Sequence, residues 1–173
     1  QQRVLLRLGE AVDLVQEEHG GAVVEVALAL GLLHDLGKYT PEFQKRLTGD
    51  TTPVDHSTAG AKIARQAYGT NLGQLFAYAL AGHHAGLANG RGTGGRRPLS
   101  ERLATNTYPL DPRWRDDIVL PDVSIPSLTP KRERAFFQYA FLCRMLFSCL
   151  VDADYIETER FYARIHNLDR SRG

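Results

Sequence analysis

An apolar segment near the middle of the first third of the chain ends in an adjacent histidine and aspartate. Almost every side chain of residues 22–33 is apolar, which is typical of a helix buried on most faces rather than an amphipathic surface helix. His34 and Asp35 follow directly, and Gly37 is expected to end the helix before Lys38. Burying an imidazole beside a carboxylate costs several kcal/mol unless a partner compensates, and a divalent cation compensates both groups. The alternative is that His34 caps the helix and Asp35 pairs with Lys38.

Length and charge predict a single domain over residues 1–173. The 173 residues are 43% hydrophobic and 24% charged, which suits one well-packed core and is too little for two. With 21 basic and 20 acidic residues the formal net charge is +1, so nucleic-acid contacts would have to come from local clusters. No run reaches the roughly 18 apolar residues of a membrane span, and we therefore expect no membrane contact.

The two cysteines predict a reducing compartment. Cys143 and Cys149 fall in one expected helix, where a rise of about 1.5 Å per residue separates their α-carbons by roughly 9 Å. That separation is too large for a disulfide, and unpaired thiols favour a cytoplasmic location.

Helical periodicity predicts an all-α, compact helical bundle with long loops. The expected helices cover residues 4–15, 22–33, 41–47, 55–68, 72–83, 99–105 and 130–155. Thr40-Pro41-Glu42 has the N-cap, first-turn proline and acidic residue of a helix start. Five prolines between residues 109 and 130 predict an ordered excursion over the surface, and the last helix is expected to be the central hydrophobic one. No stretch alternates with period two, so no strands are expected.

Several polar residues end or interrupt these apolar helices, and together they indicate a metal site. The candidates are His34, Asp35, His56, His83, His84 and either Asp152 or Asp154. Any one of them alone could be an ordinary buried or capping residue. Imidazole with carboxylate suits a divalent transition metal such as manganese, iron, cobalt, nickel or zinc, whereas magnesium prefers oxygen ligands and is less suitable. Six ligands exceed a structural zinc site and would suit two ions about 3.5–4 Å apart.

Asp152 and Asp154 point in different directions on one helix, so only one of them can face the core. Asp154 continues the apolar series Cys143, Phe147 and Leu150, whereas Asp152 continues a more mixed strip. We therefore assign Asp154 as the ligand and Asp152 to the surface or to a position behind the ligands.

The motifs, in their order along the chain, resemble the HD nuclease domain of the CRISPR-associated type I interference protein. They are His34-Asp35-Leu36-Gly37-Lys38 with Phe43-Gln44, then Asp55-His56-Ser57, Gly82-His83-His84-Ala85-Gly86, and Ser148-Cys149-Leu150-Val151-Asp152-Ala153-Asp154-Tyr155. The resemblance runs from about Leu5 to Phe161.

This resemblance implies a helical, metal-dependent nuclease that degrades single-stranded DNA by attack of a metal-activated water on the phosphodiester. It implies metal ligands at His34, Asp35, His56, His83, His84 and Asp154, with Asp35 bridging the ions. Lys38 would lie near the scissile phosphate and stabilise charge on its oxygens. The implied partners are a helicase domain or subunit that feeds in the displaced strand, and a CRISPR RNA-guided surveillance complex.

The first expected helix departs from this family. The family usually has a further histidine about thirty residues before the HD pair, and Val4, Leu5 and Leu6 occupy that place here. Either this ligand precedes Gln1, or the protein holds one of two ions weakly. No Walker-type motif is found, so the expected helicase is a separate protein or a part removed from this chain.

Basic residues suggest a path for the DNA backbone. A glycine-rich loop carries Arg91, Arg96 and Arg97, and Lys45 and Arg46 lie on the helix after the HD pair. These cations could contact phosphates without reading bases, although the loop could equally be a solvated linker. Two other functions remain open: a phosphohydrolase acting on nucleotides or cyclic nucleotides, and a degenerate, non-catalytic binding module.

Overall fold

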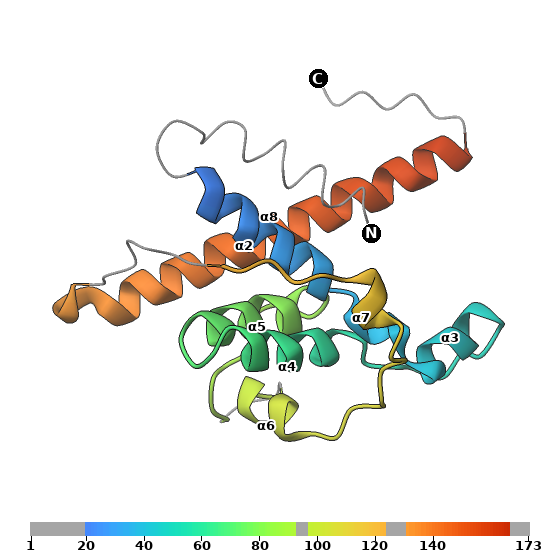
Figure 1. Cartoon of the computed structure of the whole chain (residues 1–173), viewed down its shortest axis with the longest axis horizontal. Helices are drawn as coiled ribbons and strands as arrows, with labels where there is room; N and C mark the ends of the chain where they lie inside the picture. Colours follow the sequence, from blue (N-terminus) through green and yellow to red (C-terminus); the bar gives the residue numbers. More distant parts are fainter. Residues whose placement is uncertain (1–19, 93–96, 124–130, 167–173) are drawn as a thin grey trace.

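The computed structural model describes residues 20–92, 97–123 and 131–166, and every regular element in these ranges is helical (Figure 1). The elements are α2 Gly20–Leu33, η1 Leu36–Tyr39, α3 Pro41–Leu47, α4 Ser57–Ala67, α5 Leu72–Gly82, α6 Leu99–Ala104, α7 Trp114–Asp117, η2 Arg132–Arg134 and α8 Ala135–Ile165. The described residues contain no strand, which confirms the predicted all-α class. The helix expected over residues 4–15 lies outside the described residues.

Helices α4 and α5 pack side by side at the centre, with α2 and α8 on one side and α6 on the other (Figure 1). The core between them is mostly aliphatic, with Leu33, Phe76 and Leu80 fully buried. Gly60 of α4 lies directly against the backbone of α2, because a Cβ at this position would overlap the carbonyl oxygen of Leu33. The close crossing of α2 and α4 therefore depends on a residue without a side chain, and it brings the end of α2 beside the start of α4.

The start of α3 has the predicted capping pattern. The Thr40 hydroxyl accepts a hydrogen bond from the backbone N–H of Phe43 at 3.3 Å, and Pro41 occupies the first turn. A second bond, from the Thr40 hydroxyl to the Gly37 carbonyl at 2.7 Å, joins this cap to η1. The HD segment and α3 are thus held as one continuous unit.

The last helix differs from its prediction in both position and burial. It was expected over residues 130–155, but α8 begins at Ala135 after η2 and continues to Ile165. It continues because residues 156–165 contain no proline or glycine to stop it. The expectation of a central hydrophobic helix is also wrong, because only Cys143 and Leu150 of α8 are buried among the described residues.

The segment 132–165 is long and apolar enough to cross a membrane, with a mean hydropathy of 1.3 in its best window. The sequence pattern did not predict this, because no uninterrupted apolar run marks it. Core helices of non-membrane proteins pass the same test, so a single such helix is weak support for a membrane span. The prediction that the chain has no membrane contact stays a prediction.

The proline-rich segment after α6 contains a helix, among its described residues, that the sequence did not predict. Trp114, which is 6% exposed, begins the short α7 and joins the core together with Ile118. Asp111 connects this segment to the HD region through a backbone hydrogen bond to the Tyr39 carbonyl at 2.9 Å. Both cysteines are free, as predicted.

Candidate metal centre

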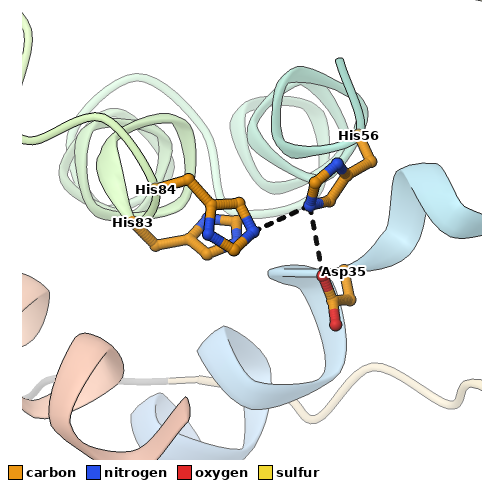
Figure 2. Close-up of side chains that lie close together, drawn as sticks. All are labelled: Asp35, His56, His83 and His84. Carbon is orange, nitrogen blue, oxygen red and sulfur yellow. Dashed lines mark hydrogen bonds and ion pairs between the residues drawn. The ribbon is translucent and has the colours of Figure 1, made fainter. Parts of the chain in front are cut away.

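Four predicted ligands from three separate segments converge on one point (Figure 2). Asp35 lies between α2 and η1, His56 directly precedes α4, and His83 and His84 follow α5. One ligand atom from each of these residues lies within 4.8 Å of the other three. Nitrogen ligands of one tetrahedral ion with bonds of about 2.0–2.1 Å are roughly 3.3 Å apart, so these spacings suit a shared cation.

A backbone contact holds the first two segments together. The N–H of Gly37 donates to the carbonyl of His56 at 3.0 Å, and a Cβ on Gly37 would overlap that same carbonyl. Asp35 and His56 are consequently fixed relative to each other by main chain rather than by side-chain packing. The His56 ring also packs edge-on against Phe43, with ring centroids 5.1 Å apart.

The buried histidines are oriented by backbone carbonyls. Nδ1 of His34 lies 2.8 Å from the Gly31 carbonyl, and Nδ1 of His83 lies 2.7 Å from the Leu80 carbonyl. A carbonyl only accepts, so each Nδ1 must carry the hydrogen, and Nε2 is directed into the site. The same arrangement orients metal-binding histidines in general.

Asp154 of α8, the carboxylate assigned as a ligand from the sequence, lies beside the cluster. Its Oδ1 lies 3.7 Å from Nε2 of His34, whereas Asp152 is exposed. His34 Nε2 is also 3.2 Å from Asp35 Oδ2. All six predicted ligands therefore lie together, in two groups that share Asp35.

The two oxygens of Asp35 face different groups. Oδ2 lies 2.5 Å from the Lys38 ammonium and near His34, while Oδ1 lies 3.6 Å from Nε2 of His56. The carboxylate is thus placed between the His34–Asp154 group and the three remaining histidines. Lys38 pairs with Asp35, as the alternative interpretation expected, but this pairing satisfies only one carboxylate oxygen.

The charged groups around His34 raise its pKa by more than burial lowers it. Burial disfavours the imidazolium, but hydrogen bonds and charges from Asp154 and Asp35 together raise the pKa of His34 to about 9. Burial raises the pKa of Asp35, but the hydrogen bonds and charges of His34 and Lys38 outweigh it and hold this pKa well below the usual range. The pKa of Asp154 is likewise lowered, chiefly by its hydrogen bond to His34.

The environment of His83 and His56, on the other side of Asp35, favours neutral imidazoles. Burial lowers the pKa of His83 to about 4, and burial also lowers the pKa of His56. These rings are neutral at pH 7 and present lone pairs, which is the state in which imidazole binds a metal.

Unsatisfied polar atoms show that the site fits a cation. Among the described residues, the buried Oδ1 of Asp35 and Nε2 of His83 have no hydrogen-bond partner. Nε2 of His56 and Nε2 of His84 face each other at 2.7 Å. One divalent cation would satisfy the two unpartnered atoms and would take the place of the hydrogen shared by the His56 and His84 rings, and the mixed oxygen and nitrogen chemistry of the four atoms suits a transition metal.

Residues 3–111 match the HD domain family. The chain belongs to the HD domain family. No curated protein matches the sequence. HD domains are typically metal-dependent hydrolases, and the Asp–His cluster of this HD domain could hold a divalent metal.

Of the basic residues predicted to contact DNA, Arg46 contacts a residue next to the site of the HD domain, and Arg97 shares a pocket with one of its histidines. Lys45 and Arg46 are exposed on α3, and Arg46 lies over the Phe43 ring, 5.9 Å from its centroid. Arg91 and Arg97 are exposed on the loop after α5, and Arg97 lines a pocket that also includes His84. Arg96 lies outside the described residues.

Sequence reasoning missed one residue that supports the HD domain site. Arg102 of α6 forms an ion pair with Asp55, at 3.2 Å between Nη2 and Oδ2, beside the start of α4. Asp55 in turn accepts hydrogen bonds from the backbone N–H groups of Ser57 and Thr58, each at 3.0 Å. Asp55 could have been recognised as a helix-capping residue, but no sequence pattern marks Arg102 as its partner.

Proposed function

We propose that this HD domain is a metal-dependent nuclease that cleaves single-stranded DNA in CRISPR type I interference. The observation that carries the proposal is the convergence of Asp35, His56, His83 and His84 within 4.8 Å at helix ends. The order of the HD, DHS, HHAG and DADY motifs along the chain supports the finer assignment to the CRISPR nuclease.

Each residue of the cluster has a role that follows from its environment. A bound divalent ion supplies Lewis acidity and lowers the pKa of water toward about 7. His56 and His83 offer neutral nitrogen ligands, and Asp35 offers one oxygen to each side of the centre. The Lys38 side chain is 43% exposed, so its ammonium is free to reach from Asp35 toward a phosphoryl oxygen of the substrate.

The partners and location belong to the same proposal. A helicase domain or subunit would supply the single strand, and a CRISPR RNA-guided complex would select the target. A cytoplasmic location is supported by the two free cysteines, Cys143 and Cys149.

The proposal is tested by incubating the protein with circular single-stranded DNA and, separately, with a panel of nucleotides and cyclic nucleotides in one manganese buffer. Cleavage of the circle is expected, because an endonuclease needs no strand end. Asp35→Ala should abolish this cleavage while the helical circular dichroism stays unchanged. Activity of purified Asp35→Ala at the parental rate would contradict the site assignment.

A nucleotide phosphohydrolase is the second candidate, and one observation favours it. The pocket beside His84 has a volume of about 530 Å³, which is in the range of small-ligand sites. Hydrolysis of a nucleotide without cleavage of the circle would select this candidate. A protein that binds no metal by elemental analysis, after purification without chelator, would instead be a non-catalytic binding module.

A further inference from the structure

A pocket adjoins the metal centre on the side of His84. It is lined by residues from the start of α4, the loop after α5 and the start of α6, among them Asp55, Gly86, Ala88, Arg97 and Arg102, and its volume is about 530 Å³. His84 belongs to this lining and also lies 2.7 Å from His56 in the candidate metal centre. A ligand in the pocket would therefore reach the edge of the centre.

Arg102 forms a fixed wall of this pocket. Its Nη2 lies 2.8 Å from the hydroxyl oxygens of Ser57 and Thr58 and 3.2 Å from Asp55 Oδ2, and its Nη1 donates to the Ala81 carbonyl. The guanidinium consequently ties α6 to α4 and α5. Its charge is matched by Asp55, whose pKa falls to about 2 because hydrogen bonds from Thr58 and the Arg102 charge outweigh partial burial.

Arg97 is available to a ligand. Its side chain is exposed, its Nη2 donates to the Thr105 hydroxyl at 2.7 Å, and among the described residues it forms no ion pair. A guanidinium has five N–H donors in a rigid fork, so one bond to Thr105 orients the group and leaves donors for a phosphate. Because the negative charge of Asp55 balances the positive charge of Arg102, the guanidinium of Arg97 gives the pocket a net positive charge.

The remaining lining leaves room for a nucleoside. Ala85, Gly86 and Ala88 have small side chains or none, and Gly86 turns the chain with φ of 83°, a left-handed conformation that favours glycine. Apart from the His84 imidazole, the described residues of the lining carry no aromatic ring on which a base could stack. The pocket therefore suits binding through phosphate and shape, with little discrimination between bases.

From these features we propose that the pocket binds the nucleotide that flanks the scissile phosphodiester, with Arg97 on its phosphate. The proposal rests on the proposed phosphodiester cleavage at the Asp35–histidine cluster, because His84 is the link between the two sites. Such a pocket would hold the neighbouring phosphate of a strand and so position the bond to be cut. A free nucleotide has the same chemistry, and the two sources are separated by experiment.

The test compares Arg97→Gln with Arg91→Gln, which removes another exposed arginine of the same loop that is not among the described lining residues of the pocket. Binding of thymidine 5′-monophosphate is measured by calorimetry, with thymidine as the probe without phosphate, in manganese and again in chelator. We expect Arg97→Gln to weaken monophosphate binding about tenfold and to leave thymidine binding unchanged. Arg91→Gln should change neither.

Two further measurements distinguish a strand from a free nucleotide. For a thymidylate oligomer, the log–log salt dependence of binding should become shallower by about 0.7 in Arg97→Gln, as expected for one lost phosphate contact. Hydrolysis of bis-p-nitrophenyl phosphate, which is too small to need the pocket, should change less than twofold in both variants. If Arg97→Gln loses more activity on the oligomer than on this small diester, the pocket holds a nucleotide of a DNA strand rather than a free nucleotide.

The outcomes separate this proposal from the proposed function. Equal binding of monophosphate by Arg97→Gln and the parent, or an equal loss in Arg91→Gln, would overturn the pocket assignment. Arg97-dependent binding of the monophosphate without any cleavage of DNA would support the pocket and reject the nuclease. If Arg97→Gln also loses bis-p-nitrophenyl phosphate hydrolysis, Arg97 supports the metal centre rather than a nucleotide, and the proposal fails.

Discussion

His34 and His83 end neighbouring helices, but their electrostatic environments are opposite. The pKa of His34 is raised to about 9 by Asp154 and Asp35 against the effect of burial, so the folded chain favours the imidazolium there. The pKa of His83 is lowered to about 4 by burial, so the folded chain favours the neutral ring. The unfolded value for both is 6.5.

This contrast predicts that the chelator-treated protein is most stable near pH 6.5. The stabilisation from His34 is fully present below pH 6.5 and is lost as pH rises to about 9, by an amount on the order of 3 kcal/mol. His83 acts in the reverse sense, and its contribution is lost as pH falls from 6.5 to about 4. Urea unfolding between pH 4 and 9 measures both limbs. In His34→Gln the alkaline limb should become flatter, and an unchanged limb would show that another group causes it.

Asp154 and Asp152 provide a matched pair on one helix. Asp154→Asn removes a charge 3.7 Å from His34, so it should weaken manganese binding about 10- to 100-fold and lower the pKa of His34. Asp152→Asn alters an exposed carboxylate, so manganese affinity should stay within twofold of the parent and the pKa of His34 should not change. Manganese titration and the proton resonances of the histidine rings measure these changes. The reverse pattern would show that Asp152, and not Asp154, faces the site.

Among the elements, the contact between α2 and α4 is the most sensitive to substitution. Gly60→Ala would raise intrinsic helix propensity, but its Cβ would overlap the Leu33 carbonyl oxygen, so the two helices must separate. We expect a loss of at least about 2 kcal/mol in unfolding free energy together with weaker manganese binding. In Gly92→Ala, the new Cβ would lie in an exposed loop, 3.3 Å from the Pro98 ring and 3.7 Å from the Glu101 carboxylate, and the unfolding free energy should stay within about 0.5 kcal/mol of the parent. A Gly60→Ala protein as stable as the parent would show that the helices need not approach so closely.

The sequence predicted those elements whose signals are local. The Thr40-Pro41-Glu42 cap of α3 and the stripe that leads to His83 both depend on neighbouring residues, and both are found. The face of α8 that carries Asp154 was also found, because helical phase follows directly from spacing. The wrong bounds of α8 and its overestimated burial arise because apolar composition does not show which neighbours cover a helix. Arg102 was missed for a similar reason, since its partner Asp55 is 47 residues away and only the packing of α6 brings them together.

For the molecule as a whole, the candidate metal centre is a junction of four helices. Asp35 follows α2, His56 precedes α4, His83 and His84 follow α5, and Asp154 belongs to α8. An ion held by these residues would bind the folded chain far better than the unfolded one, so it should stabilise the entire domain.

Manganese at 100 times its dissociation constant should therefore add about 2.7 kcal/mol and raise Tm by roughly 5 to 10 °C. Thermal unfolding in manganese and in chelator measures the difference. Asp35→Ala should lose most of this metal-dependent shift, since Asp35 faces both groups of ligands. An equal shift in Asp35→Ala would locate the bound ion elsewhere in the chain.

The bonds from His34 and His83 to carbonyls three residues earlier serve two needs at once. Each bond satisfies a carbonyl that the end of a helix leaves open, and each selects the ring nitrogen that faces the site. The orientation of each ring is accordingly set within the last turn of the helix that carries it, by a bond between residues three positions apart. If such a turn is grafted onto the end of another helix, its imidazole should adopt the same orientation without further design.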